Sequence, residues 1–165
     1  LFKERFATLC GINALYKVQN NLYKIMNFEE KIINLNQKLV SDNCEGMKAQ
    51  RVASKISKYK NLIQSIYFST QDLIYSSYFN TQFSKITTTA DIDSYRFKLY
   101  NYKNYIGISE NYSNFNDYYI NKMVDLDAKY ESIINNTSIA VIKSSAVSTF
   151  FKKIKAILTS EIELQ

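Results

Sequence analysis

The most telling absence from this 165-residue sequence is proline, which occurs nowhere in it. Proline removes a backbone donor and breaks helix interiors, so its absence suits long helices and argues against a fold with many turns. Glycine is scarce as well, and only Gly11, Gly46 and Gly107 are available for tight turns. No apolar run approaches the roughly 20 residues that span a bilayer. These features favour one helical domain covering residues 1–165.

Histidine is also absent, which removes the commonest general base and metal ligand near neutral pH. Two widely separated cysteines do not suggest a zinc site, and neither a glycine-rich phosphate loop nor a nucleophile elbow occurs. The acidic pairs Asp91/Asp93 and Asp125/Asp127 lack the further ligands of a calcium loop, so we interpret them as helix caps or solvated groups. We therefore expect a protein that is not an enzyme and uses no metal or other cofactor and no small-molecule substrate.

The two cysteines, Cys10 and Cys44, bear on how the first helix runs. If residues 10–40 form continuous helix, a rise of about 1.5 Å per residue separates the thiols by tens of ångströms. A disulfide needs Cα atoms about 4.4–6.8 Å apart. Either the helix breaks, near Gly11 or Asn27, or both thiols are free; we favour free thiols.

The apolar residues of segment 15–79 predict a long helical hairpin folded at residues 41–46. They recur at alternating steps of three and four, and this average of about 3.5 residues keeps one apolar seam against a partner helix, as in a coiled coil. Glu29, Asn36 and Thr70 interrupt the pattern, and Asn36 either sets the register and the number of partner helices or faces a turn and has no role. The predicted seam consists of Leu15, Val18, Leu22, Ile25, Ile32 and Leu39 before the turn and Val52, Ile56, Tyr59, Ile63, Ile66 and Leu73 after it.

The predicted fold class is all-α, an elongated antiparallel bundle of four to five helices. The hairpin takes residues 1–86, with helices over 1–40 and 44–86 and a cap at Asp42 or Asn43. Shorter helices fill residues 91–165. The third runs from a cap at residue 91 or 93 to residue 108, the fourth is centred on 119–133, and the last covers 139–158. A polar break at 135–138, with Ser138 as a cap, separates the last two.

Positive charge is concentrated in the hairpin. Residues 1–90 contain twelve Lys and Arg against six Asp and Glu, whereas residues 91–165 contain nine of each. Lysines recur on one side of each hairpin helix, and such stripes can bind nucleic-acid phosphates or anionic lipid headgroups, or can be ordinary solvated faces. Lysine outnumbers arginine eighteen to three, which disfavours reading of base sequence. The candidate basic patch consists of Lys31, Lys38, Lys48, Arg51, Lys55 and Lys58.

Tyrosine and phenylalanine crowd the middle of the chain, interleaved with serine and asparagine. Tyrosine with these small polar residues is typical of adaptable protein-binding surfaces, because it gives contact area with little side-chain entropy to lose. The alternative is that about half of these rings are core. The candidate partner-binding residues are Tyr75, Tyr78, Tyr100, Tyr102, Tyr105, Tyr112 and Tyr118.

These observations favour a non-enzymatic interaction module whose Tyr/Asn/Ser-rich surface binds another protein. The first residue is not methionine, and together with the hydroxyl-rich surface this suggests an exported or surface component, such as an adhesin, a pilus-associated subunit or an effector. One alternative is a nucleic-acid- or ribonucleoprotein-associated bundle that uses the basic end of the hairpin. Another is a membrane-active helical protein that opens to expose its hydrophobic hairpin. The amphipathic segment 139–158 either lies on a membrane surface or is the closing helix of the bundle.

Overall fold

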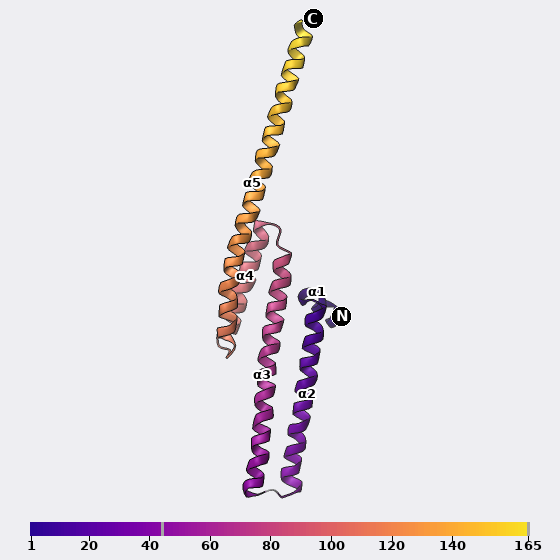
Figure 1. Cartoon of the computed structure of the whole chain (residues 1–165), viewed down its shortest axis with the longest axis vertical. Coiled ribbons are helices and arrows are strands. Elements are labelled where there is room, and N and C mark those ends of the chain that lie inside the picture. The colour runs from indigo at the N-terminus through magenta and orange to yellow at the C-terminus, as the bar shows by residue number, and fades with distance from the viewer. Residues whose placement is uncertain (44, 165) are drawn as a thin grey trace.

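The computed structural model describes residues 1–43 and 45–164, with side chains described for all of these except 137–148, 151 and 160–164. Over the described residues the chain forms α-helices and no strand, which confirms the all-α prediction (Figure 1). The helices are α1 (Phe2–Cys10), α2 (Ile12–Ser41), α3 (Gly46–Ser84), α4 (Thr89–Ile106) and α5 (Tyr112–Leu164).

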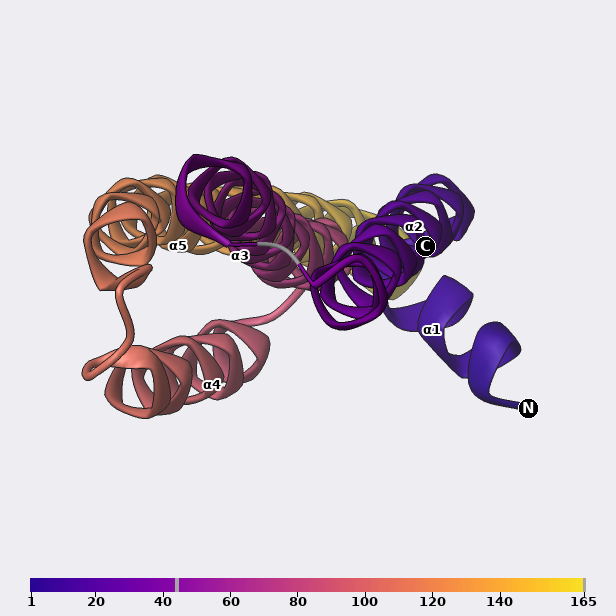
Figure 2. The ribbon, with the colours of Figure 1, turned by 90° about the horizontal axis from the view of Figure 1, so that it is seen from below.

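Helix α3 is shared by two packing units, and together they give the molecule a long, narrow shape. From its start to about Leu73, α3 pairs antiparallel with α2, and the short α1 packs against the end of this pair far from the turn. The remainder of α3 packs with α4 and with the first part of α5, as the view along the long axis shows (Figure 2). The rest of α5 continues beyond the other helices toward the C-terminus (Figure 1).

The prediction of one helix over residues 1–40 is wrong, because the chain bends at Gly11. This glycine has φ 94° and ψ 153°, in the left-handed half of backbone space that glycine enters without the penalty of a Cβ atom. The bend turns α1 back against α2 and α3 and buries Cys10. Cys10 is a free thiol, as expected, and burial raises its pKa.

The hairpin seam confirms the predicted pairing of helices and corrects its register on α2. The predicted α3 residues are buried or half-buried, and so is Thr70, which interrupts the apolar pattern. On α2, Leu22 is 50% exposed, and Glu29 and Asn36 are exposed as well. The true seam lies one residue earlier at these three points and runs through Val18, Asn21, Ile25, Phe28, Ile32, Leu35 and Leu39.

The register of α2 is shifted because a polar pair occupies the seam. The Asn21 side-chain amide donates to Thr70 Oγ1 over 3.0 Å, and the Thr70 hydroxyl donates to the Ile66 carbonyl over 2.7 Å. Both polar groups are therefore satisfied inside the interface. The prediction chose the apolar Leu22 beside Asn21, and in doing so it passed over Phe28 and Leu35, which directly precede Glu29 and Asn36.

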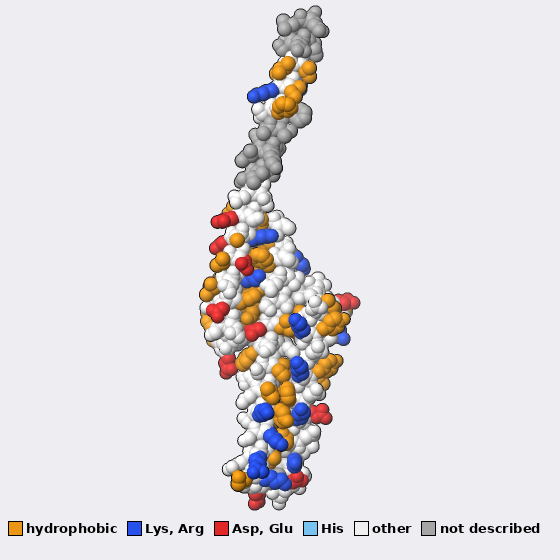
Figure 3. Space-filling model, in the orientation of Figure 1, with side chains coloured by type: hydrophobic (Ala, Val, Ile, Leu, Met, Phe, Trp, Pro, Cys, Tyr) orange, Lys and Arg blue, Asp and Glu red, His pale blue; other side chains and the backbone are white. Residues whose placement is uncertain are grey.

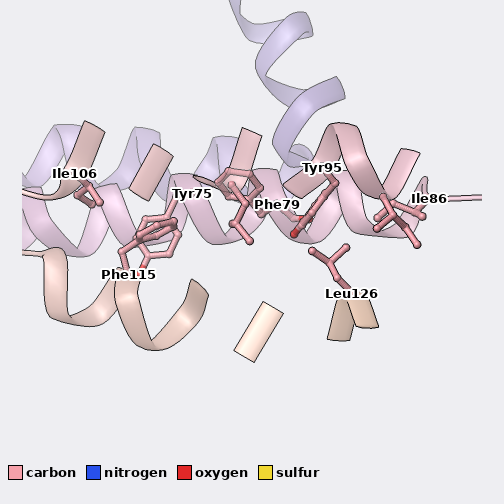
Figure 4. Packing of buried hydrophobic residues seen from close by; sticks show 9 residues of the cluster. Tyr75, Phe79, Ile86, Tyr95, Ile106, Phe115 and Leu126 are labelled. Carbon is pink, nitrogen blue, oxygen red and sulfur yellow. The ribbon is translucent and has the colours of Figure 1, made fainter. Parts of the chain in front are cut away.

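The second unit has a core rich in aromatic rings, shown close up in Figure 4. Phe115 and Leu126 of α5 are fully buried against α3 and α4, and the Phe115 ring meets Tyr102 and Tyr75 edge-on, with centroids 4.8 and 5.0 Å apart. Such edge-to-face pairs stabilise a core beyond the area that they bury. The core residues are Tyr75, Phe79, Ile86, Ile92, Tyr95, Leu99, Ile106, Phe115 and Leu126.

Three predicted helix ends are corrected. Asp42 ends α2, and α3 begins after Glu45 without a side-chain cap, so neither Asp42 nor Asn43 caps it. Helix α4 is capped by Thr88, whose hydroxyl accepts from the Asp91 amide while the Asp91 carboxylate accepts from the Thr88 amide, a reciprocal capping box. Helix α5 runs unbroken through 135–138, because asparagine and serine disfavour helix by less than about 0.7 kcal/mol each and no proline or glycine follows Gly107.

Candidate interaction surfaces

The seven candidate tyrosines divide between core and surface. Tyr75 is only 5% exposed, and its ring packs against Phe115 and Tyr118 with centroids 5.0 and 5.3 Å apart. Tyr75 is therefore mainly a core residue, although it also contributes to the floor of an open groove between α3 and α4. Four more of the candidates, Tyr78, Tyr102, Tyr112 and Tyr118, are partly buried against the same core, as is Tyr119.

The hydroxyl groups of these inner tyrosines are used within the fold. Tyr118 donates to Asn80 Oδ1 over 2.6 Å and so connects α5 to α3, while the buried Tyr95 donates to the Phe79 carbonyl over 3.0 Å. Burial raises the pKa of Tyr118 and Tyr95 above the ordinary tyrosine range, and the Asp125 carboxylate adds to the effect in both. These side chains join the helices of the core.

Tyr100 and Tyr105 are the candidates that point outward. They are 54% and 77% exposed, and Phe97 and Ile108, which were not among the candidates, are 67% exposed and fully exposed. At about 100° per residue, positions 97, 100 and 105 lie within roughly 140° of arc, on the side of α4 opposite its buried residues. We call Phe97, Tyr100, Tyr105 and Ile108 the outer α4 surface. The signal that could have identified it is the helical spacing of these four apolar residues.

An open groove of about 390 Å³ lies between α3 and α4, beside the outer α4 surface. Its walls include Ile74 and Tyr78 from α3 and Tyr102 and Tyr105 from α4, with Lys98 as a charged group. Tyr105 therefore belongs to both the groove and the outer α4 surface. A shallow apolar concavity next to exposed aromatic rings can accept an apolar anchor from another protein.

Polar contacts hold α4 and α5 in place behind this surface. Asn111, which is buried, donates its side-chain amide to the Asp72 carboxylate of α3, and Asn114 donates to Asn111 Oδ1 over 3.0 Å. Arg96 pairs with Asp127 at 2.7 Å, so this carboxylate connects α5 to α4. These contacts connect the loop after α4 and the start of α5 to α3, and they connect α4 to α5.

The candidate basic patch lies on the hairpin, and all six of its side chains are exposed. Lys31 extends over two stacked rings, with Nζ 5.4 Å from the Phe28 centroid and 5.5 Å from that of Tyr59. Because Phe28 and Tyr59 come from opposite helices, Lys31 stands directly over the seam. Figure 3 shows Lys and Arg side chains on both flanks of an apolar stripe along this half of the molecule.

Among the residues that the structure describes, no group of three or more Cys, Asp or Glu side chains is arranged to hold a metal ion. None of the helices, over the same residues, is long and apolar enough to cross a membrane.

In comparisons with known proteins, no family model, curated protein or solved structure matches this chain significantly.

Proposed function

We propose that this protein is a non-enzymatic interaction module that binds another protein through the outer α4 surface. The observation that carries the proposal is the exposure of Phe97, Tyr100 and Tyr105 on the side of α4 opposite its buried residues, with the exposed Ile108 in the turn that follows the helix. Contiguous exposed apolar groups are uncommon on monomeric proteins and typically mark interaction sites.

The chemistry of the surroundings fits a protein partner. Asn101 and Asn104 are exposed between the aromatic rings of α4, so hydrogen-bonding groups alternate with apolar contact area. The adjacent groove offers a recess for an apolar side chain of the partner. A rigid helix with pre-positioned rings loses little conformational entropy when it binds.

The test compares two double variants that each remove two exposed tyrosines. Tyr100→Ser with Tyr105→Ser alters the outer α4 surface, whereas Tyr16→Ser with Tyr23→Ser alters rings on α2 that are 58% and 64% exposed. Each variant is used to capture partners from extracts of the native cells at low and high salt, and the affinity of a captured protein is then measured with purified components.

We expect a partner that remains bound at high salt to be retained by the α2 variant and lost by the α4 variant. Truncation of interface tyrosines should cost at least about 2 kcal/mol, which is about thirtyfold in Kd. Equal affinities for the two variants, or capture that disappears at high salt, would contradict the proposal.

A further inference from the structure

The hairpin carries a second surface, which is basic and independent of the outer α4 surface. In the seven-residue repeat of α2, Val18, Ile25, Ile32 and Leu39 occupy position a, which places a lysine at every g position from 17 to 38. In α3, with Ala49 and Ile56 at position a, lysines occupy g positions 48 and 55, and basic residues occupy c positions 51 and 58. The basic hairpin face consists of Lys17, Lys24, Lys31, Lys38, Lys48, Arg51, Lys55 and Lys58.

The two lysine rows lie on the same side of the hairpin. In an antiparallel helix pair the g positions of one helix line the same edge of the seam as the g positions of the other. The position of Lys31 over Phe28 and Tyr59, one ring from each helix, agrees with this arrangement. Positive side chains flank both sides of the seam in Figure 3. From the sequence, each stripe was visible but their common side was not.

Acidic residues do not interrupt this face. Segment 48–58 contains none, and the two in segment 17–38, Glu29 and Glu30, occupy positions e and f on other sides of α2. The acidic residues Asp42 and Glu45 lie at the turn between α2 and α3, beyond the end of the lysine row. The c positions of α2, which adjoin the lysine row, are polar and uncharged: Asn20, Asn27, Asn34 and Ser41.

This composition distinguishes between two anionic partners. Lysine with asparagine and serine is the set of groups that contacts phosphate and sugar oxygens in nucleic acids. A lipid surface also requires apolar anchors, and the most exposed aliphatic ones on α2, Met26, Ile33 and Val40, occupy b positions on the opposite side of this helix from the lysines. On the basic side, Leu62 occupies a g position of α3 and is 36% exposed. Within a row, successive lysines are about 10.5 Å apart along the helix axis. A lysine ammonium also lacks the forked geometry with which an arginine side chain recognises bases.

We propose that the basic hairpin face binds the sugar–phosphate backbone of nucleic acid without reading its sequence. The test removes four charges from this face with Lys31→Gln, Lys38→Gln, Lys48→Gln and Lys55→Gln. The control removes four exposed lysines elsewhere: Lys3→Gln, Lys60→Gln, Lys85→Gln and Lys153→Gln. Both variants lose the same charge from a chain of net charge +6, so an effect of net charge alone would change them equally.

Affinity is measured by fluorescence anisotropy with a short DNA duplex and a single-stranded RNA. We expect six phosphate contacts to give a slope of log K against log salt of about −5 on duplex DNA, between about 50 and 200 mM. The slope should fall to about −2 in the face variant and stay near −5 in the control. Circular dichroism verifies folding, and a second variant that replaces Lys24 instead of Lys31 preserves the ring contact.

Three results would overturn the proposal: equal loss in the two variants, no loss in the face variant, or binding to phosphatidylserine vesicles without binding to either nucleic acid. Vesicles of phosphatidylcholine with and without phosphatidylserine provide the last comparison. Equal affinity for DNA duplexes of unrelated sequence is expected, since no base contact is proposed.

Discussion

Because some aromatic rings lie in the core and others on the surface, replacing a phenylalanine by alanine should have very different effects on stability at two positions on adjacent helices. Phe115 is fully buried, and its ring lies within 4.8–6.5 Å of five other aromatic rings. Phe97 is 67% exposed. Phe115→Ala should therefore destabilise the protein strongly, whereas Phe97→Ala should leave its stability almost unchanged.

The magnitude follows from burial and from the cavity left behind. Losing a fully buried phenylalanine side chain forfeits up to about 3 kcal/mol of transfer free energy. The cavity brings typical Phe→Ala losses to about 3–5 kcal/mol, and the lost ring pairs place Phe115→Ala near the upper limit. For a domain with about 5–15 kcal/mol of total stability, this is a third or more. Phe97→Ala should change stability by no more than about 0.5 kcal/mol.

Urea unfolding followed by circular dichroism measures both values. The midpoint should fall sharply for Phe115→Ala and remain at the wild-type value for Phe97→Ala. If both substitutions lowered the midpoint alike, the packing of α4 and α5 against α3 would be wrong.

Three further predictions concern backbone, seam and ionisation. Gly11→Ala should lower stability by about 1–2 kcal/mol because φ is positive there, whereas Gly107→Ala, at φ −57°, should be neutral or slightly stabilising; thermal melting distinguishes them. A double-mutant cycle on Asn21→Ala and Thr70→Ala should give a coupling of about 1 kcal/mol, and additive losses would show that the two side chains do not interact. Because folding raises the pKa of the Cys10 thiol and of buried tyrosines such as Tyr118, the unfolded chain ionises first, and stability should fall as the pH rises from about 9 to 11. Urea midpoints that do not change across this range would contradict the account.

The hairpin was predictable because its apolar repeat is long. The α3 side was correct at every predicted seam position, since segment 52–73 offers an apolar residue at each step except Thr70. On α2 the pattern offered Leu22 beside Asn21, and choosing the apolar neighbour made Glu29 and Asn36 look like exceptions. Phe28 and Leu35, which directly precede Glu29 and Asn36, indicate the correct register in the sequence, and the hydrogen bond from Asn21 to Thr70 accounts for the polar residue within it.

The candidate tyrosines were harder to divide, because a tyrosine is suited to core and surface alike. Tyr75 and Tyr105 look equivalent in sequence, yet α5 covers one and leaves the other 77% exposed. Which side of α4 is covered depends on the contacts of Asn111 with Asp72 and of Arg96 with Asp127, which join residues 39 and 31 positions apart. No local spacing encodes such contacts.

The most direct test of the proposed interaction places a photoreactive side chain at position 105 of the full chain in its native cells, with position 23 of α2 as the control. Both native residues are exposed tyrosines. The account predicts one specific protein adduct after irradiation at position 105, absent at position 23. Adducts of the same protein at both positions, or adducts at position 23 alone, would contradict the assignment of the outer α4 surface as the binding site.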